Sequence, residues 1–178
     1  MKTRKMLIVV DMQNDFIDGA LGTKEAEAIV PAAAERIRQA VAAGEEIYAT
    51  LDTHGADYAV TQEGIRLPVP HCIRGTQGWE LRKEIREALG GCTLVEKPTF
   101  GSIRLPEIIR EKGEPDADTA IELLGLCTDI CVVVNALLLK TAFPEAKLRV
   151  NSACCAGVTP EKHRAALETM ASCQIDIL

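Results

Sequence analysis

Residues 119–143 read TAIELLGLCTDICVVVNALLLKTAF, and they decide the fold. The opening apolar run, TAIELLGL, is typical of a strand buried on both faces of a parallel sheet. From residue 128 the sequence TDICVVVNALLLKTAF continues without a turn signal and predicts a helix. A buried strand that leads directly into a helix is the basic unit of an α/β protein.

The same alternation of strand and helix extends in both directions along the chain. Strands are predicted at residues 5–12, 46–52, 92–97, 119–126, 147–157 and, as a short last strand, 174–178. Helices are predicted at residues 23–46, 78–91, 105–114, 128–143 and 159–173. The pattern predicts one domain over residues 1–178, with a three-layer α-β-α architecture and a mostly parallel central sheet of about six strands. Residues 53–78 are rich in Gly, Pro and polar residues and are expected to form a long, functional loop.

Composition and charge exclude several classes of protein. A net charge of −6, scattered lysines and arginines and few aromatic residues argue against nucleic-acid binding. No apolar run approaches the ~18 residues that a membrane span needs, and the apolar stretch at residues 6–10 is too short for a signal peptide. Seven cysteines without a secretion signal favour reduced thiols over a disulfide framework. We therefore expect a cytoplasmic protein. The Gly-rich and Walker-type nucleotide motifs are absent from the sequence.

Polar residues gather where the predicted strands end. Asp11, Asp52 and Lys97 each stand at the end of a strand, and residues 127–131 follow another. In an open parallel sheet, ligands bind at the carboxyl ends of the strands. These residues are therefore expected to converge on one rim of the sheet.

Cys131 has two possible roles. At the start of a helix, free N–H groups and the helix dipole would lower the pKa of the thiol and could hold an oxyanion, which suits a nucleophile. The alternative is a small buried side chain with a packing role. The presence of Asp11 and Lys97 on the same rim favours the role of Cys131 as a nucleophile.

A nucleophilic cysteine needs a base. His163 lies in the last predicted helix and is expected to be a solvated surface residue. Asp11 is the better candidate, because burial at a strand end raises the pKa of a carboxyl group toward a useful range; the alternative is an acid that caps a loop. Lys97 could stabilise a negative intermediate or the thiolate, or could simply be a surface lysine.

A metal site is suggested by Asp52, His54 and His71. An Asp-x-His pair with a distant histidine offers mixed oxygen and nitrogen ligands that suit zinc, iron or manganese. Glu63 lies between the two histidines and could be a fourth ligand. The alternative is that the histidines only make hydrogen bonds within the loop and that Glu63 is exposed.

Taken together, these segments resemble the isochorismatase-like cysteine hydrolases, and within them the nicotinamidase-type amidohydrolases. The resemblance covers nearly the whole chain. It is carried by LIVVDMQNDFIDGALG (residues 7–22), VEKPTFGS (95–102), LLGLCTDICVVVNALLL (123–139) and CAGVTPEKHRAALETM (155–170), with LDTHGAD and LPVPHCIRGT as the metal segments.

The resemblance implies specific roles for individual residues. Asp11 would be the base, Lys97 the supporting cation and Cys131 the nucleophile. The N–H groups of Cys127 and Cys131 would form the oxyanion hole, with a non-proline cis peptide bond between Leu126 and Cys127. Phe16 would form an aromatic wall for the substrate. Asp52, His54 and His71 would bind a divalent metal, most simply zinc, and the metal would bind the pyridine nitrogen. The resemblance does not specify Glu63, which we add as a fourth ligand.

The function implied is hydrolysis of a small amide, nicotinamide to nicotinate plus ammonia, through a Cys131 thioester, in NAD salvage. One departure concerns the stretch IRLPVPH, which lacks the aromatic residue usual before the metal-loop histidine; Trp79 is near in sequence. The substrate could thus be another small amide. Two alternatives stay open: a metal-independent hydrolase of the same superfamily that cleaves an isochorismate-type vinyl ether or a carbamoyl group, and a non-enzymatic thiol switch using CTDIC. Family members often form homo-oligomers, which we expect here too.

Overall fold

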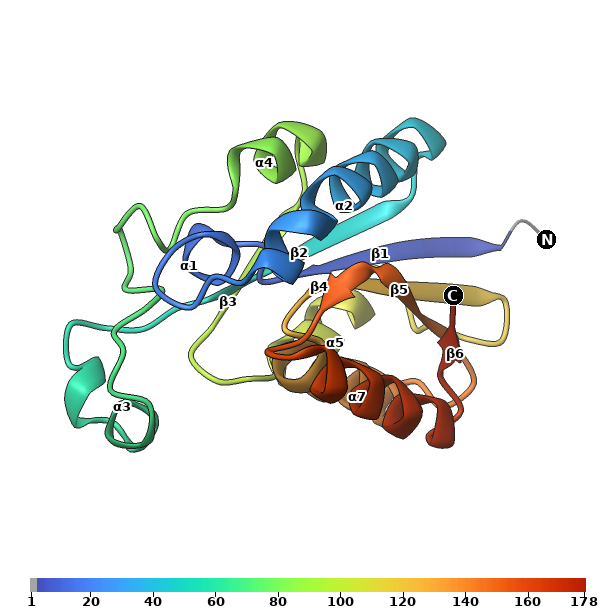
Figure 1. Ribbon diagram of the computed structural model, residues 1–178. Helices are drawn as coiled ribbons and strands as arrows, with labels where there is room; N and C mark the ends of the chain where they lie inside the picture. The colour runs from blue at the N-terminus through green and yellow to red at the C-terminus, as the bar shows by residue number, and fades with distance from the viewer. Residues whose placement is uncertain (1–2) are drawn as a thin grey trace.

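The computed structural model describes residues 3–178. A central sheet of six parallel strands lies between two layers of helices (Figure 1). The strand order is β3-β2-β1-β4-β5-β6, so the chain starts in the middle of the sheet and adds strands toward both edges. The predicted α/β fold with a parallel six-stranded sheet is therefore confirmed.

The strands follow the predicted pattern closely. They are β1 (Arg4–Val10), β2 (Glu46–Asp52), β3 (Thr93–Lys97), β4 (Thr119–Leu126), β5 (Lys147–Ala156) and β6 (Asp176–Ile177). In the central strand β1 all residues from Met6 to Val10 are at most 1% exposed. Each such aliphatic side chain stabilises the fold by roughly 1.5–3 kcal/mol relative to exposure. This explains why an uninterrupted apolar run, rather than an alternating one, marks this strand.

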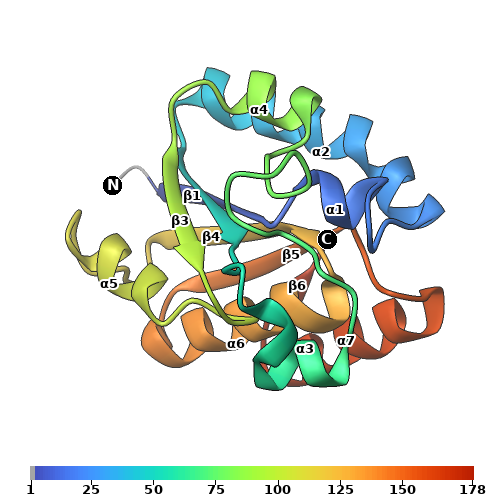
Figure 2. The ribbon, with the colours of Figure 1, turned by 90° about the vertical axis from the view of Figure 1, so that its left-hand side faces the viewer.

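The helices cover both faces of the sheet. One layer contains α1 (Asn14–Ile17), α2 (Lys24–Ala43) and α4 (Lys83–Leu89); the other contains α5 (Arg104–Arg110), α6 (Val133–Ala142) and α7 (Pro160–Ser172) (Figure 2). Helix α2 starts where the Thr23 hydroxyl accepts a hydrogen bond from the amide of Ala26, and it ends at Gly44 in the left-handed conformation. Thr23 and Gly44 therefore mark the two ends of α2.

Two local predictions were wrong. Residues 53–78 are not a plain loop, because they contain a 3-10 turn, η1 (Tyr58–Val60), and a short helix, α3 (Gln62–Arg66). The predicted helix at 78–91 begins only at Lys83. The helix predicted at 128–143 is present, and its first turn is π-helical, η2 (Thr128–Val132). Helix α1 was missed, because a one-turn helix has no apolar period to read.

None of the helices in residues 3–178 is long and apolar enough to cross a membrane. All seven cysteines are free thiols, as the sequence led us to expect.

Candidate active site

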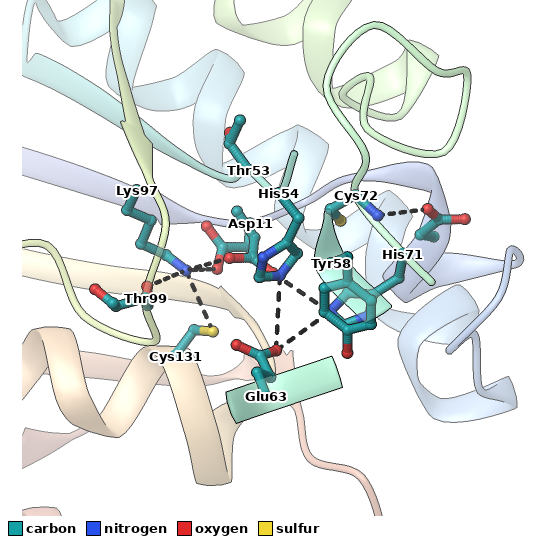
Figure 3. Close-up of polar contacts among 12 residues, drawn as sticks. Asp11, Thr53, His54, Tyr58, Glu63, His71, Cys72, Lys97, Thr99 and Cys131 are labelled. Atoms are coloured by element: carbon teal, nitrogen blue, oxygen red, sulfur yellow. Dashed lines mark hydrogen bonds and ion pairs between the residues drawn. The ribbon is translucent and has the colours of Figure 1, made fainter. Parts of the chain in front are cut away.

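The carboxyl ends of four neighbouring strands bring the candidate residues together. Asp11 directly follows β1, Asp52 ends β2, Lys97 ends β3 and pairs with Asp52 in register, and Cys131 lies in the η2 turn after β4. Figure 3 shows the Lys97 ammonium group pointing at both Asp11 and Cys131. Asp11 has φ +47°, a left-handed conformation that turns the chain away from the sheet at this point.

Lys97 stands at the centre of a buried polar cluster. Its Nζ lies 2.6 Å from Asp11 Oδ2 and 3.5 Å from Asp52 Oδ1. It also donates to the carbonyl oxygen of Thr99 at 3.1 Å and to Cys131 Sγ at 3.4 Å. Burial works against a charged lysine, but the two carboxylates outweigh it and raise the pKa of Lys97 well above its usual range. Lys97 is therefore a permanent cation beside the sulfur.

Burial largely determines the protonation states of Asp11 and Cys131. Asp11 is fully buried, and burial raises its pKa against the opposing charge of Lys97. Burial and the negative charge of Asp11 raise the pKa of the Cys131 thiol well above its ordinary value. The expectation that the helix start would lower this pKa was wrong, since desolvation and a nearby carboxylate outweigh the dipole at this site. The resting sulfur is a thiol that needs a base.

Transfer of the thiol proton to Asp11 is the chemistry this cluster suits. The transfer moves a proton between two neighbouring buried groups, so the total charge of the cluster does not change. That costs less than releasing the proton to water and leaving a second uncompensated anion in the core. The neighbouring Lys97 stabilises the thiolate that results.

A second cluster adjoins the first through Asp52. Asp52 Oδ2 lies 3.1 Å from His54 Nε2 and 3.5 Å from His71 Nε2. Glu63 Oε1 lies 3.6 Å from each of the same two nitrogens. Asp52, His54 and His71 are all buried and could hold a metal ion together. Glu63 comes from α3, a short helix that the sequence did not predict.

The donor set fits a divalent metal. In a tetrahedral site with bonds of ~2.1 Å the donors stand about 3.4 Å apart, which agrees with the separations of 3.1 to 3.6 Å around the two histidines. His71 Nδ1 is 2.9 Å from the carbonyl oxygen of Val69. A carbonyl can only accept, so Nδ1 carries a proton and Nε2 faces the cluster. Without a metal a protonated Nε2 can donate to Asp52, and a bound metal would displace that proton and take the lone pair.

Protonation of this second cluster follows from its contacts. Despite burial, hydrogen bonds from His54 and His71 and the charge of Lys97 hold the pKa of Asp52 well below its usual range. Burial disfavours the charged form of His71, yet its bonds to Asp52 and Val69 raise its pKa. Asp52 is therefore an anion that contacts both Lys97 and the histidines.

The sequence model of the Isochorismatase domain family matches residues 5–178. The chain belongs to this family. Over 98% of both chains it is 26% identical to a nicotinamidase/pyrazinamidase from Mycobacterium tuberculosis. The fold is similar to the crystal structure of pyrazinamidase from Pyrococcus horikoshii in complex with zinc, with a TM-score of 0.80, 27% identity and 98% of each chain covered. It is also similar to the nicotinamidase/pyrazinamidase from Bacillus subtilis, with a TM-score of 0.83, 26% identity and the same coverage.

One feature that the resemblance to this family implied, the cis peptide bond, is present. The Leu126–Cys127 peptide bond is cis, and Cys127 immediately precedes the η2 turn that carries Cys131. Phe16 lies in α1 with its ring centroid 5.6 Å from that of His71, so an aromatic face borders the histidine cluster. The indole nitrogen of Trp79 donates to the hydroxyl of Thr53 at 2.8 Å.

Sequence reasoning missed several residues that shape the site of this isochorismatase-family chain. The Tyr58 ring lies against both histidines, with centroids 4.8 Å from His54 and 5.1 Å from His71 (Figure 3). The Thr50 hydroxyl donates to Asp11 Oδ1 at 2.6 Å. The side chain of Gln13 accepts from the amide of Asp52 and donates to its carbonyl, each at 2.8 Å. Polar residues inside buried strands or next to them were the only available signal.

Proposed function

We propose that this chain is a metal-assisted cysteine amidohydrolase that converts nicotinamide to nicotinate and ammonia. The observation that carries the proposal is the buried contact of Lys97 with Asp11 and Cys131, immediately beside the Asp52 and histidine cluster. The relatives named as nicotinamidase/pyrazinamidase support the substrate. We further propose that residues 1–178 form one hydrolase domain that acts as a cytoplasmic homo-oligomer.

In the proposed mechanism, Asp11 takes the proton of Cys131 and the thiolate attacks the amide carbon. The N–H groups of Cys127 and Cys131 hold the oxyanion, and Lys97 offsets its charge. Asp11 then gives its proton to the leaving ammonia, so that a Cys131 thioester remains. A water molecule, deprotonated by Asp11, cleaves the thioester to the acid and restores the thiol.

Four residues would hold the metal: Asp52, His54, His71 and, as a proposed fourth ligand, Glu63. Once bound, the ion would supply a Lewis-acidic anchor for a ring nitrogen of the substrate. We propose zinc in preference to iron or manganese, because a compact set of nitrogen and oxygen donors at tetrahedral spacing suits it. Phe16 would lie against the substrate ring from the side of α1.

The test is ammonia release from nicotinamide by the zinc-loaded protein. Cys131→Ala should reduce kcat on the order of a thousandfold or more, because the nucleophile is gone. Cys155→Ala is the matched control: Cys155 is also a buried cysteine, but it lies within β5 away from the polar cluster, and its loss should leave kcat within about twofold.

Two outcomes would contradict parts of the proposal. Full activity in Cys131→Ala would remove Cys131 from the mechanism. A wild-type protein that binds zinc stoichiometrically yet leaves nicotinamide intact would contradict nicotinamide as the substrate. Other small amides would then be tested, because the stretch before His71 lacks an aromatic residue.

A further inference from the structure

The turn between β5 and α7 is docked against the η2 turn that carries the nucleophile. The amide of Val158 donates to Asp129 Oδ1 at 2.9 Å. Gly157 allows this close approach, since a Cβ there would lie 2.8 Å from Asp129 Oδ1 and 2.8 Å from the backbone nitrogen of His163. Any larger residue would push the two turns apart.

His163 makes a second link to the same turn. Its Nδ1 lies 2.8 Å from the hydroxyl of Thr128, the first residue of η2. The side chain is only partly exposed, which corrects the expectation of a solvated surface histidine. Burial lowers the pKa of His163, so the ring is neutral at pH 7 and its Nδ1 can accept the bond from the hydroxyl.

Thr128 links helix α7 to the η2 turn that contains Cys131. It is completely buried and follows Cys127, whose carbonyl oxygen accepts from the amides of both Ile130 and Val132 at 3.1 Å. At the far end of the turn, Asn135 Nδ2 donates to the carbonyl oxygen of Cys131 at 2.8 Å. Within η2, Thr128 is the residue whose side chain is fixed by α7.

We propose that His163 is a positioning residue which, through the hydroxyl of Thr128, holds the η2 turn so that Cys131 faces Asp11 and Lys97. The effect on turnover rests on the proposed function, but the effect on the thiol does not. Loss of the link lets the turn shift, and even a shift of about 1 Å at the nucleophile can slow the reaction considerably. His163 itself touches neither substrate nor sulfur.

The experiment measures Cys131 directly, by its rate of alkylation with iodoacetamide, followed by mass spectrometry of the peptide that contains it. The variants are His163→Leu, Thr128→Val and the double variant, with kcat and KM for nicotinamide and the melting temperature measured on each. Thr128→Val removes the hydroxyl but keeps the shape, so it tests the same link if His163→Leu does not fold. Lys162→Ala, an exposed neighbour in α7, is the matched control.

The expected result is a fall of about tenfold in both alkylation rate and kcat for each single variant, with KM within about twofold. The double variant should be no worse than either single one, because both remove the same bond. His163→Asn, whose amide oxygen can accept from the hydroxyl, should restore part of the loss. The Lys162→Ala control should behave as wild type.

Other results would overturn the inference. Alkylation and kcat within twofold of wild type in a folded His163→Leu or Thr128→Val protein would do so, and so would losses that simply add in the double variant. Failure of the proposed function is distinguishable: if wild type leaves nicotinamide intact but alkylation of Cys131 still falls in the variants, only the substrate is wrong.

Discussion

Asp11 is held by two partners with different tasks. Lys97 contacts Oδ2 at 2.6 Å, whereas the Thr50 hydroxyl donates to Oδ1. Both Asp11 and Thr50 are fully buried, so neither contact is weakened by water. The Thr50 hydroxyl therefore helps to fix the orientation of the Asp11 carboxylate.

Replacing Thr50 with valine should change the pH dependence of turnover. Burial already raises the pKa of Asp11, and the bond from Thr50 opposes this by stabilising the carboxylate. Without the hydroxyl the pKa of Asp11 rises further. Because Asp11 must be ionised to accept a proton, the acidic limb of kcat/KM should move to higher pH, and kcat/KM near that limb should fall about tenfold.

Thr50→Ser is the control for this prediction. Serine keeps the hydroxyl and removes only a methyl group, so its pH profile should match that of wild type even if stability falls slightly. A Thr50→Val enzyme with the wild-type pH profile would show that the hydroxyl does not tune the base.

At the scale of elements, the contact between β1 and β4 places Asp11 and Cys131 side by side. The two strands pair from Arg4 and Thr119 to Val10 and Gly125. Gly125 has φ +125°, and a Cβ there would lie 2.1 Å from the carbonyl oxygen of Val10. Glycine is therefore required by both the backbone conformation and the close approach of β1.

Gly125→Ala should destabilise the protein by about 3 kcal/mol or more, since it combines backbone strain with a collision against a neighbouring strand. Gly44→Ala is the matched control, because Gly44 also has a positive φ, +68°, but no atom lies within 4 Å of its would-be Cβ. Strain alone should cost about 1 kcal/mol. Urea unfolding of both variants would measure the difference, and equal losses would contradict the role given to the strand contact.

At the scale of the whole molecule, the histidine cluster ties a long connection to the sheet. Asp52 belongs to β2, His54 and His71 to the connection between β2 and α4, and Glu63 to α3 within that connection. An ion bound by all of them would hold the 53–78 segment over the active site. Such binding stabilises the folded state according to the ligand concentration relative to its Kd.

Zinc should therefore raise the melting temperature of protein stripped with a chelator. At a free zinc concentration of 100 times Kd the gain is about 2.7 kcal/mol, which corresponds to a rise of several degrees for a chain of this size. Calorimetry with and without zinc would measure it. Glu63→Gln should reduce the gain if Glu63 is a ligand, whereas Gln62→Ala, the preceding residue in α3, should leave it unchanged. A melting temperature indifferent to zinc would contradict the metal site.

The sequence by itself determined the layers and the outline of the site. Buried parallel strands carry uninterrupted apolar runs, and helices carry caps, so both could be read locally. Because parallel strands all end at one edge, the acids and the lysine that close those runs had to meet there. This is why Asp11, Asp52, Lys97 and Cys131 could be named, and why the histidines near Asp52 could be grouped with it.

The tertiary structure alone decided the protonation and the supporting contacts. The pKa of Cys131 depends on how completely it is buried and on its position beside Asp11, and neither follows from its place at a helix start. Thr50 and His163 act through residues 39 and 35 positions away in the sequence, so no local pattern marks them. Hydrogen bonds and desolvation depend on distances in space, whereas periodicity records only which side of an element faces the core.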